Sequence, residues 1–298
     1  MYFTNDDKYI WILSHNGDHH LLTQFSTSDF TNKAQISGSM NAVFYNPYNN
    51  CLYEISQRFF QDRYVYDVNL YDAATGKFNE TFVIDNSDGI RSIAFSDNGF
   101  GLMICGSVLY SIDSSNKHKI QFIDNSVMNG IAPSRIEMCN NNKTFVLYSE
   151  RYGTEIYVYT MDSETKNFQK IYSMSDYINF KIYNMMASNY TKDILYYSEY
   201  KNDIAFQDVE TKAMVTKTLT QGVKNAAILA SNKVLPDVLT SDFRLILPNE
   251  NLITNLTALH NISYMKSSNN GKLVCITYGD NLYLFQSEVF TNHNNYIK

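Results

Sequence analysis

The side chains best suited to bind a metal ion lie near the start of the chain, at His15, Asp18, His19 and His20. Imidazole and carboxylate groups are common ligands of zinc and other transition metals. The pair Asn16-Gly17 between them is typical of a tight hairpin turn, so the group is expected at a hairpin tip. Neighbouring side chains on a strand point to opposite faces, which separates His19 from His20. We expect no bound metal and no cofactor, and these four residues are the candidate ligands for the alternative that a metal binds.

A second group combines arginine with aromatic side chains. The segment Gln57-Arg58-Phe59-Phe60-Gln61-Asp62-Arg63 holds two of the six arginines of the chain beside two adjacent phenylalanines. Both residue types are enriched in binding hot spots, because they combine a large contact area with directional interactions. The segment is therefore a candidate docking site, with the alternative that Phe59 and Phe60 extend a strand and pack between neighbouring sheets.

The elements that must position these residues are best read from the stretch between Ile90 and Asp113. Ile90 to Phe95 alternates apolar and polar side chains, and Ser96-Asp97-Asn98-Gly99 has turn chemistry. Leu102 to Cys105 is a short apolar run, and Leu109 to Ile112 alternates again before Asp113. The pattern predicts a meander of three β-strands.

Imperfect copies of this meander recur along the chain. The apolar residues at equivalent positions, separated by about 36 to 51 residues, are Phe3, Phe44, Phe95, Met138, Met186, Leu229 and Met265. Tyr148-Ser149-Glu150-Arg151-Tyr152 also recurs as Tyr197-Ser198-Glu199-Tyr200-Lys201. A multi-stranded repeat of this length is typical of a β-propeller blade.

The sequence therefore predicts an all-β fold, a β-propeller of four-stranded antiparallel blades in one domain (1–298). Seven blades are expected, and six or eight are the alternatives because the sixth blade is the least regular. The predicted blades are 1–37, 38–86, 87–125, 126–174, 175–220, 221–258 and 259–298.

Two segments resemble one propeller family in particular. Leu70-Tyr71-Asp72-Ala73-Ala74-Thr75-Gly76-Lys77 is similar to the end of a WD40 repeat, with Tyr-Asp in place of Trp-Asp, and Ser92 to Gly99 resembles the start of one. The chain thus resembles a WD40-like β-propeller, although Trp11 is not followed by Asp and no Gly-His pair opens a repeat. The resemblance implies a structural role for the residues at the family's strand-end position, which are Asp72, Asp113, Asp162 and Asp208.

The resemblance also groups the candidate docking residues. In WD40-like propellers the connections between the second and third strands of each blade gather on the top face. The residues expected there are Arg58, Phe59, Phe60, Arg63, Arg151, Tyr152, Tyr200 and Lys201. The implied function is a non-catalytic protein-interaction scaffold or adaptor, and the alternative is a sensor or docking domain of a larger signalling assembly.

An enzyme is not expected. Sialidase-like propellers carry repeated Ser-X-Asp-X-Gly-X-X-Trp boxes and an arginine cluster, and quinoprotein blades carry repeated tryptophan. A single tryptophan and six arginines argue against both. No Ser/His/Asp or Cys/His set stands out, so a degenerate propeller hydrolase or small-ligand binder is kept only as an alternative.

Composition limits the partners and the location. A net charge of −6 without long runs of either sign predicts no phosphate-binding surface, so nucleic acid is not an expected partner. No apolar run approaches the ~20 residues needed to span a bilayer. Reduced, buried thiols are expected at Cys51, Cys105, Cys139 and Cys275, which lack CxxC spacing. We expect a soluble cytoplasmic protein, with the nucleus left open, that binds a protein partner and can be a subunit of a larger complex.

Overall fold

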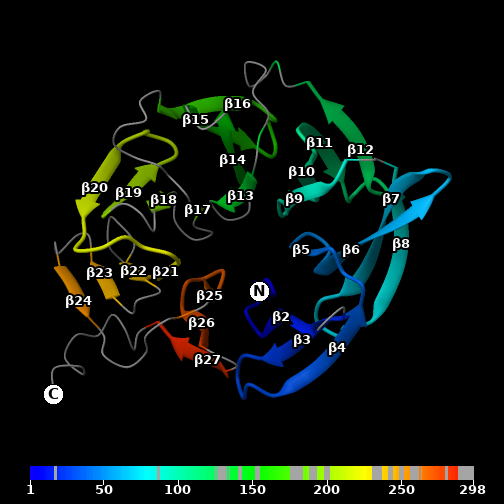
Figure 1. Cartoon of the computed structure of the whole chain (residues 1–298), viewed down its shortest axis with the longest axis horizontal. Helices are drawn as coiled ribbons and strands as arrows, with labels where there is room; N and C mark the ends of the chain where they lie inside the picture. Colours follow the sequence, from blue (N-terminus) through cyan, green and yellow to red (C-terminus); the bar gives the residue numbers. More distant parts are fainter. Residues whose placement is uncertain are drawn as a thin grey trace. The chain divides into compact units, whose positions relative to one another are not determined.

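The computed structural model describes most of the chain as antiparallel β-sheet (Figure 1). The described residues are 1–16, 19–85, 88–124, 126, 133, 135–139, 143–151, 155–174, 184–187, 193–197, 202–229, 237–240, 244–247, 252–255, 262, 264–278 and 281–287. Within them lie 27 strands in seven sheets, six with four strands and the seventh with three. The predicted all-β fold, a seven-bladed β-propeller, is confirmed.

Met1–Ser175 is one compact unit and holds the first four sheets. The first sheet contains β1 (Tyr2–Phe3), β2 (Tyr9–Asn16), β3 (His19–Ser26) and β4 (Asn32–Gly38). The second contains β5 (Ala42–Asn46), β6 (Cys51–Phe60), β7 (Arg63–Asp72) and β8 (Phe78–Ile84). The third contains β9 (Ile90–Phe95), β10 (Phe100–Cys105), β11 (Val108–Asp113) and β12 (Lys119–Ile123). The fourth contains β13 (Arg135–Cys139), β14 (Thr144–Arg151), β15 (Glu155–Asp162) and β16 (Phe168–Met174).

Asp176–Lys298 is the second compact unit and holds the other three sheets. The fifth sheet contains β17 (Asn184–Ala187), β18 (Asp193–Tyr197), β19 (Asp203–Asp208) and β20 (Met214–Thr218). The sixth contains β21 (Ala226–Leu229), β22 (Asp237–Thr240), β23 (Arg244–Leu247) and β24 (Leu252–Asn255). The seventh contains β25 (Tyr264–Ser267), β26 (Leu273–Tyr278) and β27 (Asn281–Gln286). Within each sheet, every strand pairs with the next one along the chain, as in a meander.

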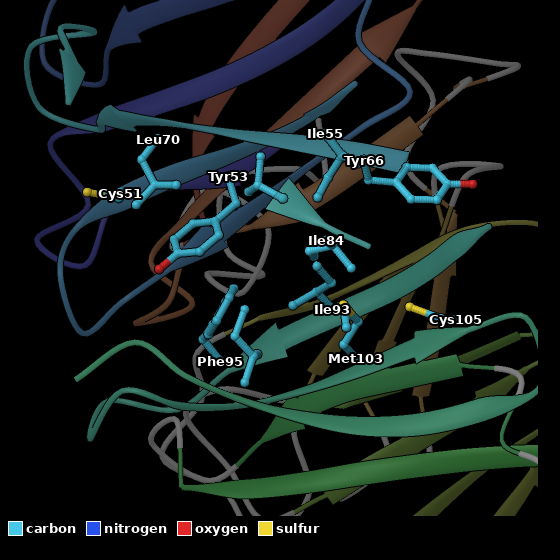
Figure 2. Close-up of a cluster of buried hydrophobic side chains, with 12 residues drawn as sticks. Cys51, Tyr53, Ile55, Tyr66, Leu70, Ile84, Ile93, Phe95, Met103 and Cys105 are labelled. Atoms are coloured by element: carbon cyan, nitrogen blue, oxygen red, sulfur yellow. The ribbon is translucent and has the colours of Figure 1, made fainter. Parts of the chain in front are cut away.

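Apolar clusters join consecutive sheets within each unit. Figure 2 shows the cluster between the second and third sheets, where Tyr53 of β6 contacts Phe95 of β9 at 4.6 Å between ring centroids. Alternate side chains of a strand point to opposite faces, so each inner strand contributes to the clusters on both sides of its sheet. Leu102 of β10, for example, belongs to the cluster with the fourth sheet, whereas Met103 belongs to the cluster with the second.

The cysteines that the structure describes with side chains are buried free thiols. Cys51 and Cys105 lie at opposite ends of the cluster in Figure 2, and Cys275 lies in β26. Burial raises the pKa of Cys105 and of Cys275 to about 12, which leaves both thiols protonated and unreactive at neutral pH. The side chain of Cys139 lies outside the described residues.

Acidic residues at the ends of third strands organise the following turns. An Asp72 carboxylate oxygen accepts hydrogen bonds from the backbone N–H groups of Ala74 and Thr75, at 3.1 and 2.7 Å. Asp162 and Asp208 each accept the same two bonds, from the second and third residues that follow them. Asp113 accepts one such bond, from Ser115 at 3.0 Å. The carboxylates therefore satisfy backbone donors that the sheet leaves unpaired.

Candidate functional site

The hairpin of β6 and β7 is the longest in the described part of the chain, with ten residues in each strand. Its pairing runs from Cys51 opposite Asp72 to Phe60 opposite Arg63. The flanking strands stop earlier, since β5 pairs with β6 only as far as Ile55 and β8 pairs with β7 only from Tyr66 onward. Residues 57–65, called the ribbon below, therefore extend past the neighbouring strands, at the right of Figure 1.

This geometry corrects the sequence prediction for the ribbon. A connection was expected between Gln57 and Arg63, but both strands continue to a two-residue turn at Gln61 and Asp62. Phe59 and Phe60 do extend the strand, yet they do not pack between sheets, because 64% and 46% of their surface is exposed.

The turn at the tip of the ribbon has an unusual backbone. Gln61 and Asp62 have φ angles of 48° and 60°, the left-handed conformation that a type I′ hairpin turn requires at both central positions. Such turns strongly favour Asn-Gly, because a side chain in this conformation clashes with its own backbone. Neither residue of the tip is glycine, so the turn lowers the stability of the hairpin.

One face of the ribbon carries an exposed aromatic pair. Phe59 and Tyr64 lie opposite each other, and their rings meet edge to face with centroids 5.3 Å apart. Tyr64 is 50% exposed. Next along the same face, the Gln57 amide donates a hydrogen bond to the Tyr66 hydroxyl at 3.1 Å. Tyr66 and Ile55 belong to the cluster of Figure 2, so this aromatic face continues the buried face of the sheet into solvent.

The opposite face of the ribbon carries the two arginines, and each has a carboxylate partner in its own neighbourhood. The Arg58 guanidinium contacts Asp67 of β7 at 2.6 Å and lies 4.9 Å from the centre of the Phe60 ring. The Arg63 guanidinium contacts Asp85, which follows β8, at 2.8 Å. These pairs hold the arginines against the ribbon.

A buried acid lies beneath the arginine face. Glu54 of β6 is 4% exposed and accepts a hydrogen bond from the Asn69 amide of β7 at 2.5 Å. The Thr81 hydroxyl of β8 in turn donates to the carbonyl oxygen of Asn69 at 2.6 Å. Burial raises the pKa of Glu54, the negative charge of Asp67 raises it further, and the bond from Asn69 acts in the opposite direction.

The other residues predicted to bind a partner are described only in part. Arg151 ends β14 opposite Glu155, at the tip of another hairpin between second and third strands, and its side chain lies outside the described residues. Tyr152, Tyr200 and Lys201 also lie outside them. These positions stay predictions.

The predicted metal candidates lie in the hairpin of β2 and β3. His15 pairs with His20 and Asn16 pairs with His19, so Asn16 is the last residue of β2 and not, as was expected, a residue of the turn. Asp18 and the side chains of His15 and His19 lie outside the described residues. Among the side chains that the structure describes, no group of three or more His, Cys, Asp or Glu is placed to hold a metal.

Sequence reasoning missed one residue of the ribbon and two acidic residues that contact it. Tyr64 completes the aromatic pair, and Asp67 and Asp85 neutralise the arginines. A two-residue turn at Gln61-Asp62 would have placed Tyr64 opposite Phe59 and brought Asp67 near Arg58, but that dipeptide has no typical turn signal.

Comparison with known proteins identifies the fold. No protein-family profile and no curated protein matches the sequence. A solved structure of U3-55K is 12% identical and covers 94% of this chain and 87% of its own, with a TM-score of 0.62. The β-propeller domain of Cps50 (Swd1) from Myceliophteria thermophila is 8% identical and covers 95% of each chain, with a TM-score of 0.61. The chain has the WD40-like β-propeller fold that the sequence predicts. In its described part, no helix is suited to cross a membrane.

Proposed function

We propose that this WD40-like propeller is a non-catalytic protein-interaction module and that the ribbon is its docking segment. Propellers bury their strands against neighbouring blades and leave the connections free to vary and to bind partners. In this chain the second sheet departs from that plan, because its middle hairpin extends beyond β5 and β8. The proposal includes that the protein lies in the cytoplasm and belongs to a larger complex.

The exposed aromatic pair carries the proposal. Phe59 and Tyr64 lie on a well-defined strand pair, not on an irregular loop, so their rings are held ready for contact. Two aromatic side chains that stay at least half exposed gain little from folding, whereas they would gain from a partner that removes them from water. Preorganised aromatic side chains are typical anchors of protein interfaces.

An alanine variant of the ribbon tests this function. We expect R58A/F59A/F60A/R63A to lose at least one protein that the immobilised wild-type chain retains from an extract of its native source. The melting temperature should fall by less than about 4 °C, since a loss of ~1 kcal/mol shifts a chain of this size by that much. Quantitative mass spectrometry of the retained proteins and a thermal unfolding curve measure the two outcomes.

The matched control is F122A. Phe122 of β12 is 63% exposed and meets Tyr110 edge to face, at 6.1 Å between centroids, so it reproduces the exposure and pairing of Phe59 outside the ribbon. F122A should retain the same proteins as the wild type. An unchanged set with the alanine variant, or equal losses with F122A, would contradict docking through the ribbon.

A further inference from the structure

We infer that the ribbon docks through its Phe59–Tyr64 face and that the partner offers an apolar pocket, not an acidic surface. This inference rests on the proposed function, and it names which of the two faces binds and what chemistry the partner must have. Arginine-rich tips ordinarily lead one to expect an acidic partner. The contacts within the second sheet argue for the opposite.

The charges of the ribbon are already balanced. Arg58 and Arg63 contact Asp67 and Asp85 at 2.6 and 2.8 Å, and Asp62 adds a third carboxylate at the turn. An acidic partner would have to displace carboxylates that are tethered to the same sheet, and it would be repelled by the remaining negative charge. The guanidinium groups therefore offer little attraction to a partner, and Arg58 instead packs over Phe60.

The aromatic face has no such internal compensation. Phe59 and Tyr64 are 64% and 50% exposed, and the ring contact that the structure shows for each is with the other. Behind them the face continues into Tyr66 and Ile55, which are buried in the cluster of Figure 2. The face is thus the solvent end of a hydrophobic core, and the burial of such a surface favours binding without any ion pair.

The shape of the ribbon decides between a flat and a concave partner. Beyond Ile55 and Tyr66 the ribbon is two strands wide, and neither β5 nor β8 supports it at the sides. Aromatic hot-spot side chains contribute most in a well-packed, fully desolvated pocket, and a narrow projection is a shape that such a pocket can enclose. The occupant that fits is a pocket of a folded protein lined by apolar side chains.

Selection from a phage-displayed library of small folded helical domains tests this inference on the full chain. Binders that recognise the ribbon should present apolar side chains, and F59A/Y64A should weaken them by about 30-fold, the loss typical of a hot spot. R58Q/R63Q and the exposed control F122A should change their affinity less than threefold. Raising the salt concentration from 50 to 500 mM should also change the affinity less than threefold.

The outcomes separate the inference from the proposed function. Binders that are weakened by R58Q/R63Q and by salt, and not by F59A/Y64A, would overturn the apolar pocket while leaving the ribbon as the docking segment. If none of the ribbon variants weakens the selected binders, the result counts against both the apolar pocket and the ribbon as docking segment. Far-UV circular dichroism and melting temperature establish that each variant is folded. Substitutions of exposed side chains should leave the fold intact.

Discussion

Glu54 shows how a single side chain can report on the integrity of the docking hairpin. It lies between the solvent-exposed ribbon and the buried part of the second sheet, and its interaction with Asn69 links β6 to β7. Because burial and Asp67 raise its pKa, the folded protein takes up a proton at Glu54 more readily than the unfolded chain does. Stability from this group is therefore full below the unfolded pKa and declines as the pH rises through the folded pKa.

We expect Glu54→Gln to raise the free energy of unfolding at pH 7 by on the order of 1 kcal/mol, because it removes a buried charge and keeps an acceptor for Asn69. The gain should shrink toward pH 4, where Glu54 of the wild type is protonated. Urea unfolding between pH 4 and pH 8 measures both effects. The control is Glu164→Gln, at a side chain that is 67% exposed and should show neither effect. A lower stability of Glu54→Gln at pH 7 would show that the charge is stabilising.

The hairpin of β6 and β7 marks the limit of what the sequence could predict. Strand β9 was predicted with its observed bounds, Ile90–Phe95, because one buried face imposes alternation of apolar and polar residues. Between Gln57 and Tyr64 both faces of the hairpin are exposed, so the alternation that indicates a strand is lost there. The strands were therefore predicted to end near Ile55 and to resume at Val65, and the register that pairs Phe59 with Tyr64 was missed.

The turn of this hairpin gives a prediction of its own. Replacing Gln61 and Asp62 by Asn and Gly supplies the residues that a type I′ turn prefers, since both positions have positive φ. We expect Q61N/D62G to stabilise the protein by about 1–2 kcal/mol, the cost of holding side chains in the left-handed conformation. Binding through Phe59 and Tyr64 should be retained, because the pairing of the ribbon is unchanged. A loss of stability in urea unfolding would show that the tip does not form this turn.

Across the chain, the repeat was easier to predict than the site. Seven meanders could be recognised because buried strands recur with turn residues between them, and Asp72, Asp162 and Asp208 are each followed by the same hydrogen-bonded turn. The second sheet differs from the others in its extended hairpin of β6 and β7. Because no other hairpin in the described part of the chain is as long, an alignment of the repeats could not reveal this extension. Composition drew attention to the arginines and phenylalanines between Gln57 and Arg63, while their ion pairs depend on contacts that spacing alone did not reveal.

The central claim is that a protein partner contacts this propeller through the ribbon. Photocrosslinking in the native source tests it most directly, with p-benzoylphenylalanine placed at Phe59 in one variant and at the equally exposed Phe122 in the other. We predict a discrete crosslinked protein from position 59 that position 122 does not give and that Tyr64→Ala reduces. Equal crosslinking from both positions would contradict the account. It would also be contradicted if position 59 gave no crosslink while another face of the protein captured a partner.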